Sequence, residues 1–486
     1  MNAQPEGYGQ ELVSFAHGLA LGDLPSDVVA RARTCLLEAI GCGMFGSTQP
    51  WSRILLTEMA AEGARGACTV FGASRLLAAP AAALVNGTAI HGFELDDLIA
   101  ESITHPAACV IPSALAAGEA VGASGARLLE AIVAGYEVMH RVGLALGTEP
   151  AKRGFHTTSL VAPVACAVAA GKVMQLDLHK LYSAVGLACS AASGVKSFAA
   201  GRGGGMVKRL HLGRSAEAGV RSAQLAARGF LGPPFALDSR FGLLEAFGGA
   251  GADAKKLSCE LGGNWAVRDV WFKVYPICGW IQSAVMLLSE ARGGRPLSIG
   301  EIRKVRIGVS AYAAKNNGEP APVDTMGAQY SIPYCAAVAL LGEPRDPGSF
   351  LVDAVNDPMT RALAAKVEIV VDPAIEAVYP RQFGASMRLE LADGTTHERT
   401  VMECHGTPAD PCSEQEHLDK FRWLAGSVLP ASAVGELTTL IEAVPALASV
   451  RDLTAKLRSA TPGKAPAKSR ARAPRSSRSI EQRFRG

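Results

Sequence analysis

The residues best suited to chemistry are carboxylates and imidazoles crowded into one short stretch of the chain. This stretch contains His91, Glu94, Asp96, Asp97 and His105. Apolar, helix-forming sequence flanks it on both sides, so burial should shift the pKa values of these groups. Groups of this kind can move protons on and off carbon or oxygen. Helix capping explains the same residues equally well, so the spacing alone leaves catalysis and structure as equal alternatives.

A further imidazole, His156, stands directly before an Ala-rich helical segment. Thr157, Thr158 or Ser159 can cap that helix, whose N-terminus is a natural site for an anion. A lone histidine before a helix is more often structural than catalytic, because buried histidines are commonly just hydrogen-bonded.

A glycine-rich segment, residues 201–205, carries Arg202 and is followed closely by Lys208 and Arg209. It lacks the spacing of a P-loop and does not follow a strand as a dinucleotide fingerprint does. Flexible backbone with lysine and arginine suits carboxylate binding, although a surface loop is the more ordinary interpretation.

Lys273 lies in an aromatic and apolar segment, residues 271–278, where the character of the chain changes. A desolvated lysine needs an anionic partner or takes a lowered pKa, and domain junctions are favoured ligand sites. The alternative is a lysine whose stem covers apolar surface. No metal site is expected, because no second spaced pair accompanies Cys404 and His405. A hydrolase elbow, Gly-x-Ser-x-Gly, is also missing from the sequence.

Helical patterns dominate the first 268 residues. The helices that they predict must position the carboxylates, imidazoles and lysines described above. Pro25 and Ser26 open one helix, and further Ala-rich patterns cover residues 81–90, 106–122, 126–147 and 159–173. Many small residues and only 6% aromatic residues indicate closely packed helices.

The pattern changes to strands between about residues 269 and 400. Alternating apolar residues predict strands at 302–310, 367–371 and 387–391, and Asp393-Gly394 predicts a hairpin into 396–402. A helix is expected at 331–341 between the strands, and helices resume at 413–427 and 431–447. The sequence thus predicts a mainly α protein with an inserted α+β domain. The expected division is 1–268 (helical), 269–400 (a smaller α/β lid), 401–458 (helical, rejoining the first part) and 459–486 (a disordered tail).

Composition excludes several classes of protein. With 49% hydrophobic and 19% charged residues the chain is not expected to be disordered, and no apolar run is long enough to span a bilayer. The net charge is +3, but eight basic and one acidic residue give the tail +7, which leaves −4 for the body. Charge alone supports only weak, salt-sensitive contact of the tail with nucleic acid, so no specific nucleic-acid partner is expected. Eleven scattered cysteines without an export signal predict buried thiols in a cytoplasmic protein.

Taken in order, the motifs resemble the MmgE/PrpD family, whose members include 2-methylcitrate dehydratase, cis-aconitate decarboxylase and iminodisuccinate epimerase. The resemblance covers about residues 10–450. Its segments are Leu24-Pro25, Ile40-Gly41-Cys42-Gly43, Asn86 to Asp97, His105-Pro106, Gly135-Tyr136-Glu137, Gly154-Phe155-His156, Met206-Val207-Lys208, Lys273 to Pro276, Gln329 to Tyr334, Asp393-Gly394 and Lys420-Phe421.

The resemblance implies a helical domain interrupted by an α/β lid, a homodimer, and an active site between the domains that needs no metal or organic cofactor. It implies that the catalytic groups are Asp96, Asp97, His105, His156, Lys208 and Lys273. The candidate substrate-binding residues are Glu94, Arg202, Tyr330 and Gln282. In that scheme the cations hold carboxylates, the two histidines transfer protons, and Asp96 or Asp97 orients a histidine or acts as base.

Three residues depart from the family pattern. Leu98 and Ile99 replace the usual Thr and His after the paired Asp, and Gln282 replaces a usual His. The resulting prediction is a cofactor-independent lyase, a dehydratase or decarboxylase, acting on a small di- or tricarboxylate. An epimerase or isomerase on the same scaffold and a catalytically silent carboxylate-binding protein stay open as alternatives.

Overall fold

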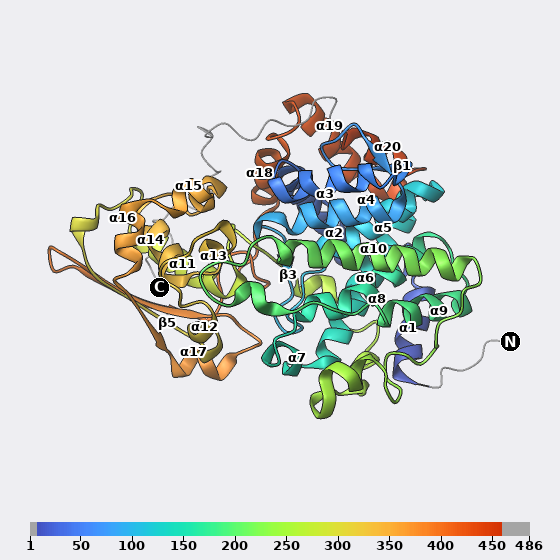
Figure 1. Ribbon diagram of the computed structural model, residues 1–486, viewed down its shortest axis with the longest axis horizontal. Helices are drawn as coiled ribbons and strands as arrows, with labels where there is room; N and C mark the ends of the chain where they lie inside the picture. The colour runs from blue at the N-terminus through green and yellow to red at the C-terminus, as the bar shows by residue number, and fades with distance from the viewer. Residues whose placement is uncertain (1–6, 459–486) are drawn as a thin grey trace.

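The computed structural model describes residues 7–458. The expected basic tail, 459–486, lies outside the described residues. The fold is mainly α with a smaller α+β part, as the sequence predicts. In Figure 1 the helices gather on the right and the α/β part lies on the left. The division into domains at residues 268 and 400 stays a prediction.

The helical part is built from ten helices early in the chain and three at its end, among the described residues. These are α1 (Tyr8–Gly18), α2 (Ser26–Ser47), α3 (Pro50–Ala61), α4 (Ala79–Ile90), α5 (Ala107–Val121), α6 (Gly125–Leu146), α7 (Glu149–Lys152), α8 (Thr157–Val173), α9 (Leu178–Cys189), α10 (Val207–Ala227), α18 (Glu414–Ala425), α19 (Ala431–Glu442) and α20 (Arg451–Lys456).

Helices α4 and α8 form the interior of the helical part, since every residue of both is buried. Helix α10 packs against both of them, and small residues allow this close approach. A Cβ atom on Gly219 would lie 2.2 Å from the Cβ atom of Cys166, and one on Gly213 would lie 2.3 Å from the carbonyl oxygen of Leu84. The Ala- and Gly-rich composition is therefore what brings the helix backbones together.

The α/β part contains one four-stranded sheet in the order β6-β5-β7-β8. Strand β5 is parallel to β6 and antiparallel to β7, and β7 pairs antiparallel with β8 across the predicted Asp393-Gly394 turn. Helices α11 and α14 pack together and against the sheet. The elements are α11 (Gln282–Ala291), β5 (Ile302–Val309), α12 (Ala311–Asn316), α13 (Thr325–Gln329), α14 (Ile332–Leu341), α15 (Val352–Val355), α16 (Pro358–Ala364), β6 (Val367–Val371), α17 (Pro373–Val378), β7 (Ala385–Leu391) and β8 (Thr396–Val401).

Two short strand pairs complete the fold, and one of them lies at the seam between the two parts. Strand β1 (Arg65–Thr69) pairs with β2 (Leu76–Leu77), and β3 (Asp97–Leu98) pairs antiparallel with β4 (Trp271–Phe272). After the α/β part, α18 returns to pack on α2, so the start and the end of the chain share one helical part (Figure 1).

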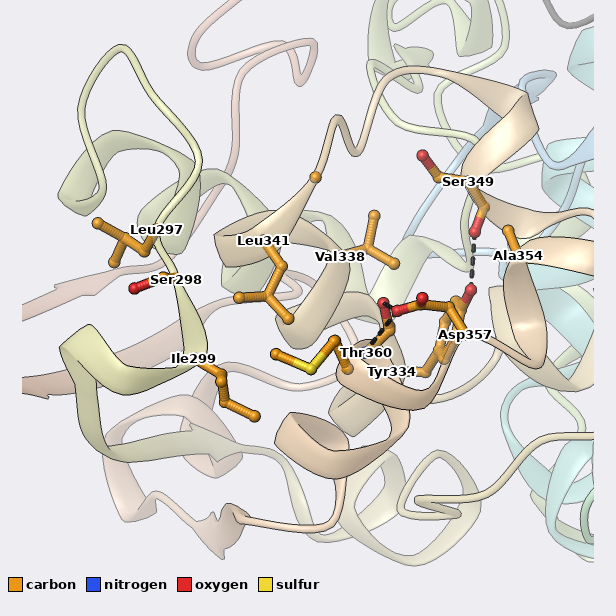
Figure 2. Close-up of a pocket in the computed structure, with 12 residues that line it drawn as sticks. Leu297, Ser298, Ile299, Tyr334, Val338, Leu341, Ser349, Ala354, Asp357 and Thr360 are labelled. Carbon is orange, nitrogen blue, oxygen red and sulfur yellow. Dashed lines mark hydrogen bonds between the residues drawn. The ribbon is translucent and has the colours of Figure 1, made fainter.

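A hollow of about 400 Å³ opens in the α/β part, away from the titratable cluster of the seam. Figure 2 shows mostly apolar side chains around it, with Tyr334 and Thr360 as hydrogen-bonded members of the lining. The Tyr334 hydroxyl donates to the Ser349 carbonyl at 2.8 Å, and Thr360 donates to the Asp357 carboxylate at 2.7 Å. These hydrogen bonds account for the Tyr334 hydroxyl and the Thr360 side chain in the lining.

Between residues 7 and 458, no helix is both long and apolar enough to cross a membrane. The cysteines are free thiols, and Cys259 is the exposed one among them.

Candidate active site

The β3–β4 pairing decides which residues meet at the seam. Asp97 pairs with Phe272 in antiparallel register, so Asp96, one residue before Asp97, lies beside Lys273, one residue after Phe272. The Lys273 ammonium lies 3.3 Å from the Asp96 carboxylate, although 177 positions separate the two residues. Lys420 on α18 fixes both strands by donating to the carbonyl oxygens of Leu95 and Lys273, at 3.0 and 2.9 Å.

Glu94 holds the two buried lysines together. It follows the short helix η2 (His91–Phe93) in a left-handed conformation, with φ of 56°, which is uncommon for a residue other than glycine. One carboxylate oxygen accepts from Lys208, in the first turn of α10, and the other accepts from Lys273 at 3.1 Å. Glu94 therefore serves as the counterion of both lysines.

Asp96 links one of these lysines to two imidazoles. Its carboxylate lies 2.7 Å from Nδ1 of His91 and 3.3 Å from Nδ1 of His105. Burial alone raises the pKa of the Asp96 carboxyl, but His91, Lys273 and His105 outweigh burial and hold the pKa well below its usual range. Asp96 is therefore a permanent anion at the centre of the cluster.

Asp97 points away from its neighbour and closes the start of a helix. It accepts from the backbone N–H of Ala107 at 2.9 Å, at the start of α5, and from the Tyr136 hydroxyl at 2.7 Å. Burial raises its pKa to about 7. Asp97 thus has the capping role that competed with catalysis in the sequence, and its backbone carbonyl contributes to the cluster.

The tautomer of His105 follows from its hydrogen bonds. Its Nδ1 lies 2.8 Å from the carbonyl oxygen of Asp97, and a carbonyl can only accept, so Nδ1 carries the proton. Burial, followed by the charge of Lys273, lowers the pKa of His105 and keeps the ring neutral. A neutral ring with its proton on Nδ1 presents a lone pair on Nε2, which is the form a general base needs.

His91 and His156 extend the imidazole cluster. The ring centroid of His91 lies 5.1 Å from that of His105 and 6.1 Å from that of His156. The Nε2 atom of His91 is buried without a hydrogen-bond partner in the described chain. Burial lowers the pKa of His91 to about 3 and lowers that of His156 well below its usual value. Three neutral imidazoles therefore lie side by side.

The two lysines differ in their electrostatics. Burial lowers the pKa of Lys208, and its ammonium stands 5.2 Å from the centre of the Tyr330 ring. For Lys273, burial acts in the same direction, but Asp96 and Glu94 outweigh it and raise the pKa above its usual value. Lys273 is consequently the fixed cation, and Lys208 gives up a proton more readily.

The other residues singled out in the sequence fall into two groups. Tyr330 lies in the cluster beside Lys208, whereas Gln282 is the first residue of α11 and its side chain is taken up by backbone groups of Tyr275 and Ile277. Arg202 is exposed and donates to the Ala321 carbonyl at 2.9 Å, so it does not join the cluster.

The glycine-rich segment binds an anion from its own chain. The Asp324 carboxylate accepts from the backbone N–H groups of Gly204 and Gly205, at 3.4 and 2.8 Å, and also caps α13 through Gly327. Arg209 likewise serves the protein, since it donates to the Gly92 carbonyl at 2.7 Å and to the Gln329 side chain at 3.1 Å. These contacts tie the loop and α10 to the α/β part.

The cluster contains residues beyond the predicted catalytic and substrate-binding set. His91 belongs to the stretch of carboxylates and imidazoles in the sequence, and Tyr136 to the Gly135-Tyr136-Glu137 segment of the family resemblance. His211, on α10, lies 3.2 Å from His156 between their Nδ1 atoms. Nothing local marked His211, because only the packing of α10 on α8 brings it to this position.

Two sets of side chains bring possible metal ligands together. His91, Asp96 and His105 offer ligand atoms within 4.8 Å of one another. A second set consists of His405 and Cys412, in the segment before α18, and Glu416, in the first turn of that helix. The ring nitrogens of His405 lie 3.2 Å from the Asp410 carboxylate and 3.0 Å from the Glu416 carboxylate. The expectation that the active site needs no metal stays a prediction.

The fold is a helical part and an α/β part with a buried cluster of carboxylates, imidazoles and lysines, a candidate acid–base site, at the seam between them. Known sequences agree with this class. The MmgE/PrpD N-terminal domain matches residues 10–254, and the MmgE/PrpD C-terminal domain matches residues 275–444. The chain belongs to the MmgE/PrpD family.

Several enzymes are similar to the chain along most of its length. A cis-aconitate decarboxylase of Aspergillus terreus is 29% identical over 469 residues, which cover 92% of this chain and 95% of that enzyme. The cis-aconitate decarboxylase of Homo sapiens is 28% identical over 467 residues, with 92% and 95% covered. A 2-methylcitrate dehydratase of Escherichia coli (strain K12) is 24% identical over 431 residues, with 83% and 86% covered. The chain is accordingly an enzyme of the MmgE/PrpD type, and these relatives are lyases.

Proposed function

We propose that the protein is a cofactor-independent lyase, a dehydratase or decarboxylase, that acts on a small di- or tricarboxylate. The observation that carries this proposal is the neutral His105 ring, whose Nδ1–H is held by the Asp97 carbonyl at 2.8 Å, which leaves the lone pair on Nε2 to accept a proton. Lys208 and Lys273 lie in the same buried cluster through Glu94, and they supply positive charge where a carboxylate substrate would develop negative charge.

In a dehydration, Nε2 of His105 takes the proton from the carbon beside a carboxylate. The electron pair of that C–H bond moves into the carboxylate, where Lys208 and Lys273 stabilise the resulting charge. The electron pair then forms the double bond, and the β-hydroxyl leaves as water after it accepts a proton from the imidazolium. Asp96 stabilises the transient imidazolium, because its carboxylate stays ionised beside the ring.

In a decarboxylation, the C–CO₂ bond breaks and its electron pair remains on the substrate, stabilised by the same lysines. The ammonium of Lys208, whose pKa burial lowers, then delivers a proton to carbon and is protonated again from solvent. Both reactions use the same buried cluster and differ in which bond to the substrate breaks.

The test is incubation of the protein with cis-aconitate, citrate and 2-methylcitrate in D₂O, followed by proton NMR. A new alkene, or loss of CO₂ with deuterium at one carbon, is the expected result. Lys208→Met should reduce the rate by about 10²–10³, since one charge-stabilising group is removed. Deuterium incorporation without net product would instead favour an epimerase. If none of the compounds reacts or exchanges, the lyase proposal is wrong.

A further inference from the structure

A third lysine, Lys196, reaches from the helical part to the α/β part. It opens the short helix η3 (Lys196–Ala199), and its backbone N–H donates to the Gly154 carbonyl at 2.7 Å. Its ammonium donates to the hydroxyl of Tyr312 on α12. The same ammonium lies 4.3 Å from the centre of the Tyr312 ring and 5.9 Å from that of the Trp280 ring. Lys196 therefore bridges the seam next to a wall of aromatic rings.

Lys196 differs from the other two lysines in having no acidic partner. Lys208 and Lys273 each contact Glu94, whereas among residues 7–458 no carboxylate lies within 4.0 Å of the Lys196 ammonium. Burial lowers the pKa of Lys196 to about 8, and the only opposing influence is the thiol of Cys278. The ammonium is partly buried and contacts a hydroxyl and aromatic rings but no anion, which favours the binding of an anion.

Two other hydrogen-bond donors lie beside this ammonium. The indole N–H of Trp280 is buried and has no acceptor in the described chain. The Tyr312 hydroxyl accepts from Lys196, so its own proton remains for another acceptor. The rings of Trp280 and Tyr312 lie 5.1 Å apart, so the three donors occupy one small region.

This region adjoins the acid–base cluster. Phe198, two residues after Lys196, packs on His156 and Tyr330 with ring centroids 5.2 and 6.0 Å apart. Cys278 provides a second connection, because it influences the pKa of Lys196 and is itself influenced by Glu94 and Lys208. Phe198 and Cys278 therefore connect the surroundings of Lys196 to those of the acid–base cluster.

The charges of the cluster call for an additional cation. Glu94 and Asp96 balance Lys208 and Lys273, and the three histidines are neutral. A substrate with two or three carboxylates brings negative charge that this balanced set cannot neutralise.

We propose that Lys196, Tyr312 and Trp280 form a second carboxylate subsite, which binds a carboxylate remote from the reacting carbon. This inference rests on the proposed function. Within the di- and tricarboxylates of the proposed function, it assigns residues to the carboxylate that lies away from the reacting carbon. The aromatic wall, which continues through Tyr379 and Phe383, excludes water from that ion pair. Lys196 comes from the helical part, and Tyr312 and Trp280 come from the α/β part. A carboxylate can therefore bind all three residues only while the two parts lie against each other.

The experiment compares Lys196→Met with a matched control, Lys315→Met, which removes an exposed lysine from the helix that carries Tyr312. The probes are tricarballylate, which has three carboxylates, and butyrate, which has one, and binding is measured by calorimetry. Lys196→Met should weaken tricarballylate binding about tenfold or more, as expected for a lost charge-assisted hydrogen bond. Butyrate binding and the Lys315→Met variant should match the unmodified protein, and Lys196→Arg should restore part of the tricarballylate affinity.

With a substrate found in the D₂O assay, Lys196→Met should raise KM by a similar factor and leave kcat within about threefold. Three outcomes would overturn the subsite. The first is that Lys196→Met binds tricarballylate as tightly as the unmodified protein does. The second is that Lys196→Met loses affinity for butyrate by the same factor as for tricarballylate. The third is that the unmodified protein does not bind tricarballylate. The D₂O assay on the unmodified protein judges the proposed function separately, so the two ideas can fail independently.

Discussion

Two buried clusters of this protein contain the same types of residue and have different consequences. Around Glu38, the carboxylate lies 2.7 Å from Nδ1 of His417 and 2.6 Å from the ammonium of Lys420. Around Asp96, a carboxylate likewise contacts imidazole and ammonium groups. Burial raises the pKa of Glu38, but Lys420 and His417 outweigh it and lower the pKa, as their counterparts do for Asp96.

The difference lies in what surrounds the imidazoles. The ring of His417 packs edge-on against Phe272, at 4.6 Å, and the remaining protons of Lys420 go to backbone carbonyls. The Asp96 cluster instead gathers neutral imidazoles beside one another and next to Lys208. Residue types alone do not distinguish a structural ion pair from a reactive one. In both clusters one imidazole has a buried Nε2 without a partner in the described chain, so the distinguishing feature is number: three imidazoles and two lysines meet around Asp96 and Glu94, and one of each meets Glu38.

The difference between the two clusters is tested most directly by removing one imidazole from each. His105→Asn should lower kcat by about 10²–10⁴, because it removes the proposed base while an amide can still donate to the Asp97 carbonyl. His417→Asn should leave kcat per folded molecule within about threefold. The measurement is steady-state turnover of the substrate found by NMR, with thermal unfolding to correct for folded protein. Equal losses of kcat in both variants would contradict the distinction.

Glu38→Gln tests the structural cluster through stability. Removing one partner of a buried ion pair leaves the ammonium of Lys420 uncompensated, so the free energy of unfolding should fall by about 3–5 kcal/mol. Urea unfolding measures this change. Glu436→Gln, at an exposed ion pair with Lys456, is the control and should cost less than about 1 kcal/mol. A stability loss in Glu38→Gln no larger than in the control would show that the cluster contributes little.

Asp97 predicts how stability depends on pH. Its pKa of about 7 in the folded protein exceeds the ordinary value of 3.8, so the folded state holds a proton that the unfolded state releases. Stability from this group is therefore present at low pH and declines as pH rises toward and through 7. Between pH 5 and 8, the free energy of unfolding of Asp97→Asn should rise relative to the unmodified protein by about 1–3 kcal/mol. A difference that does not change with pH would contradict the raised pKa.

The smallest effect is expected at Arg202, which the sequence suggested as a substrate-binding residue. Its side chain is exposed and bonds to the Ala321 carbonyl, so Arg202→Ala should change KM by less than about threefold and stability by about 0.5 kcal/mol or less. Steady-state kinetics and thermal unfolding provide both values. A KM increase of tenfold or more would place Arg202 in substrate binding after all.

Local sequence patterns predict much of the secondary structure. The alternation at residues 302–310, the Asp393-Gly394 turn and the Ala-rich periods predicted β5, the β7–β8 hairpin and the interior helices, because strand and helix periods and turn chemistry act over a few residues. The motif around residues 91–105 likewise marked the centre of the site. The sequence by itself thus determined the elements, the family and the candidate chemistry.

The tertiary structure decided which of those candidates meet. Only the β3–β4 pairing brings Lys273 to Asp96, and only the orientation of Asp97 into the start of α5 separates its role from that of its neighbour. Arg202 and Lys196 carry the same charge, lie close in the chain and both reach the α/β part, yet Arg202 is exposed and Lys196 is partly buried among aromatic rings. Contacts between distant segments depend on packing and register, and these physical quantities have no local signature in sequence.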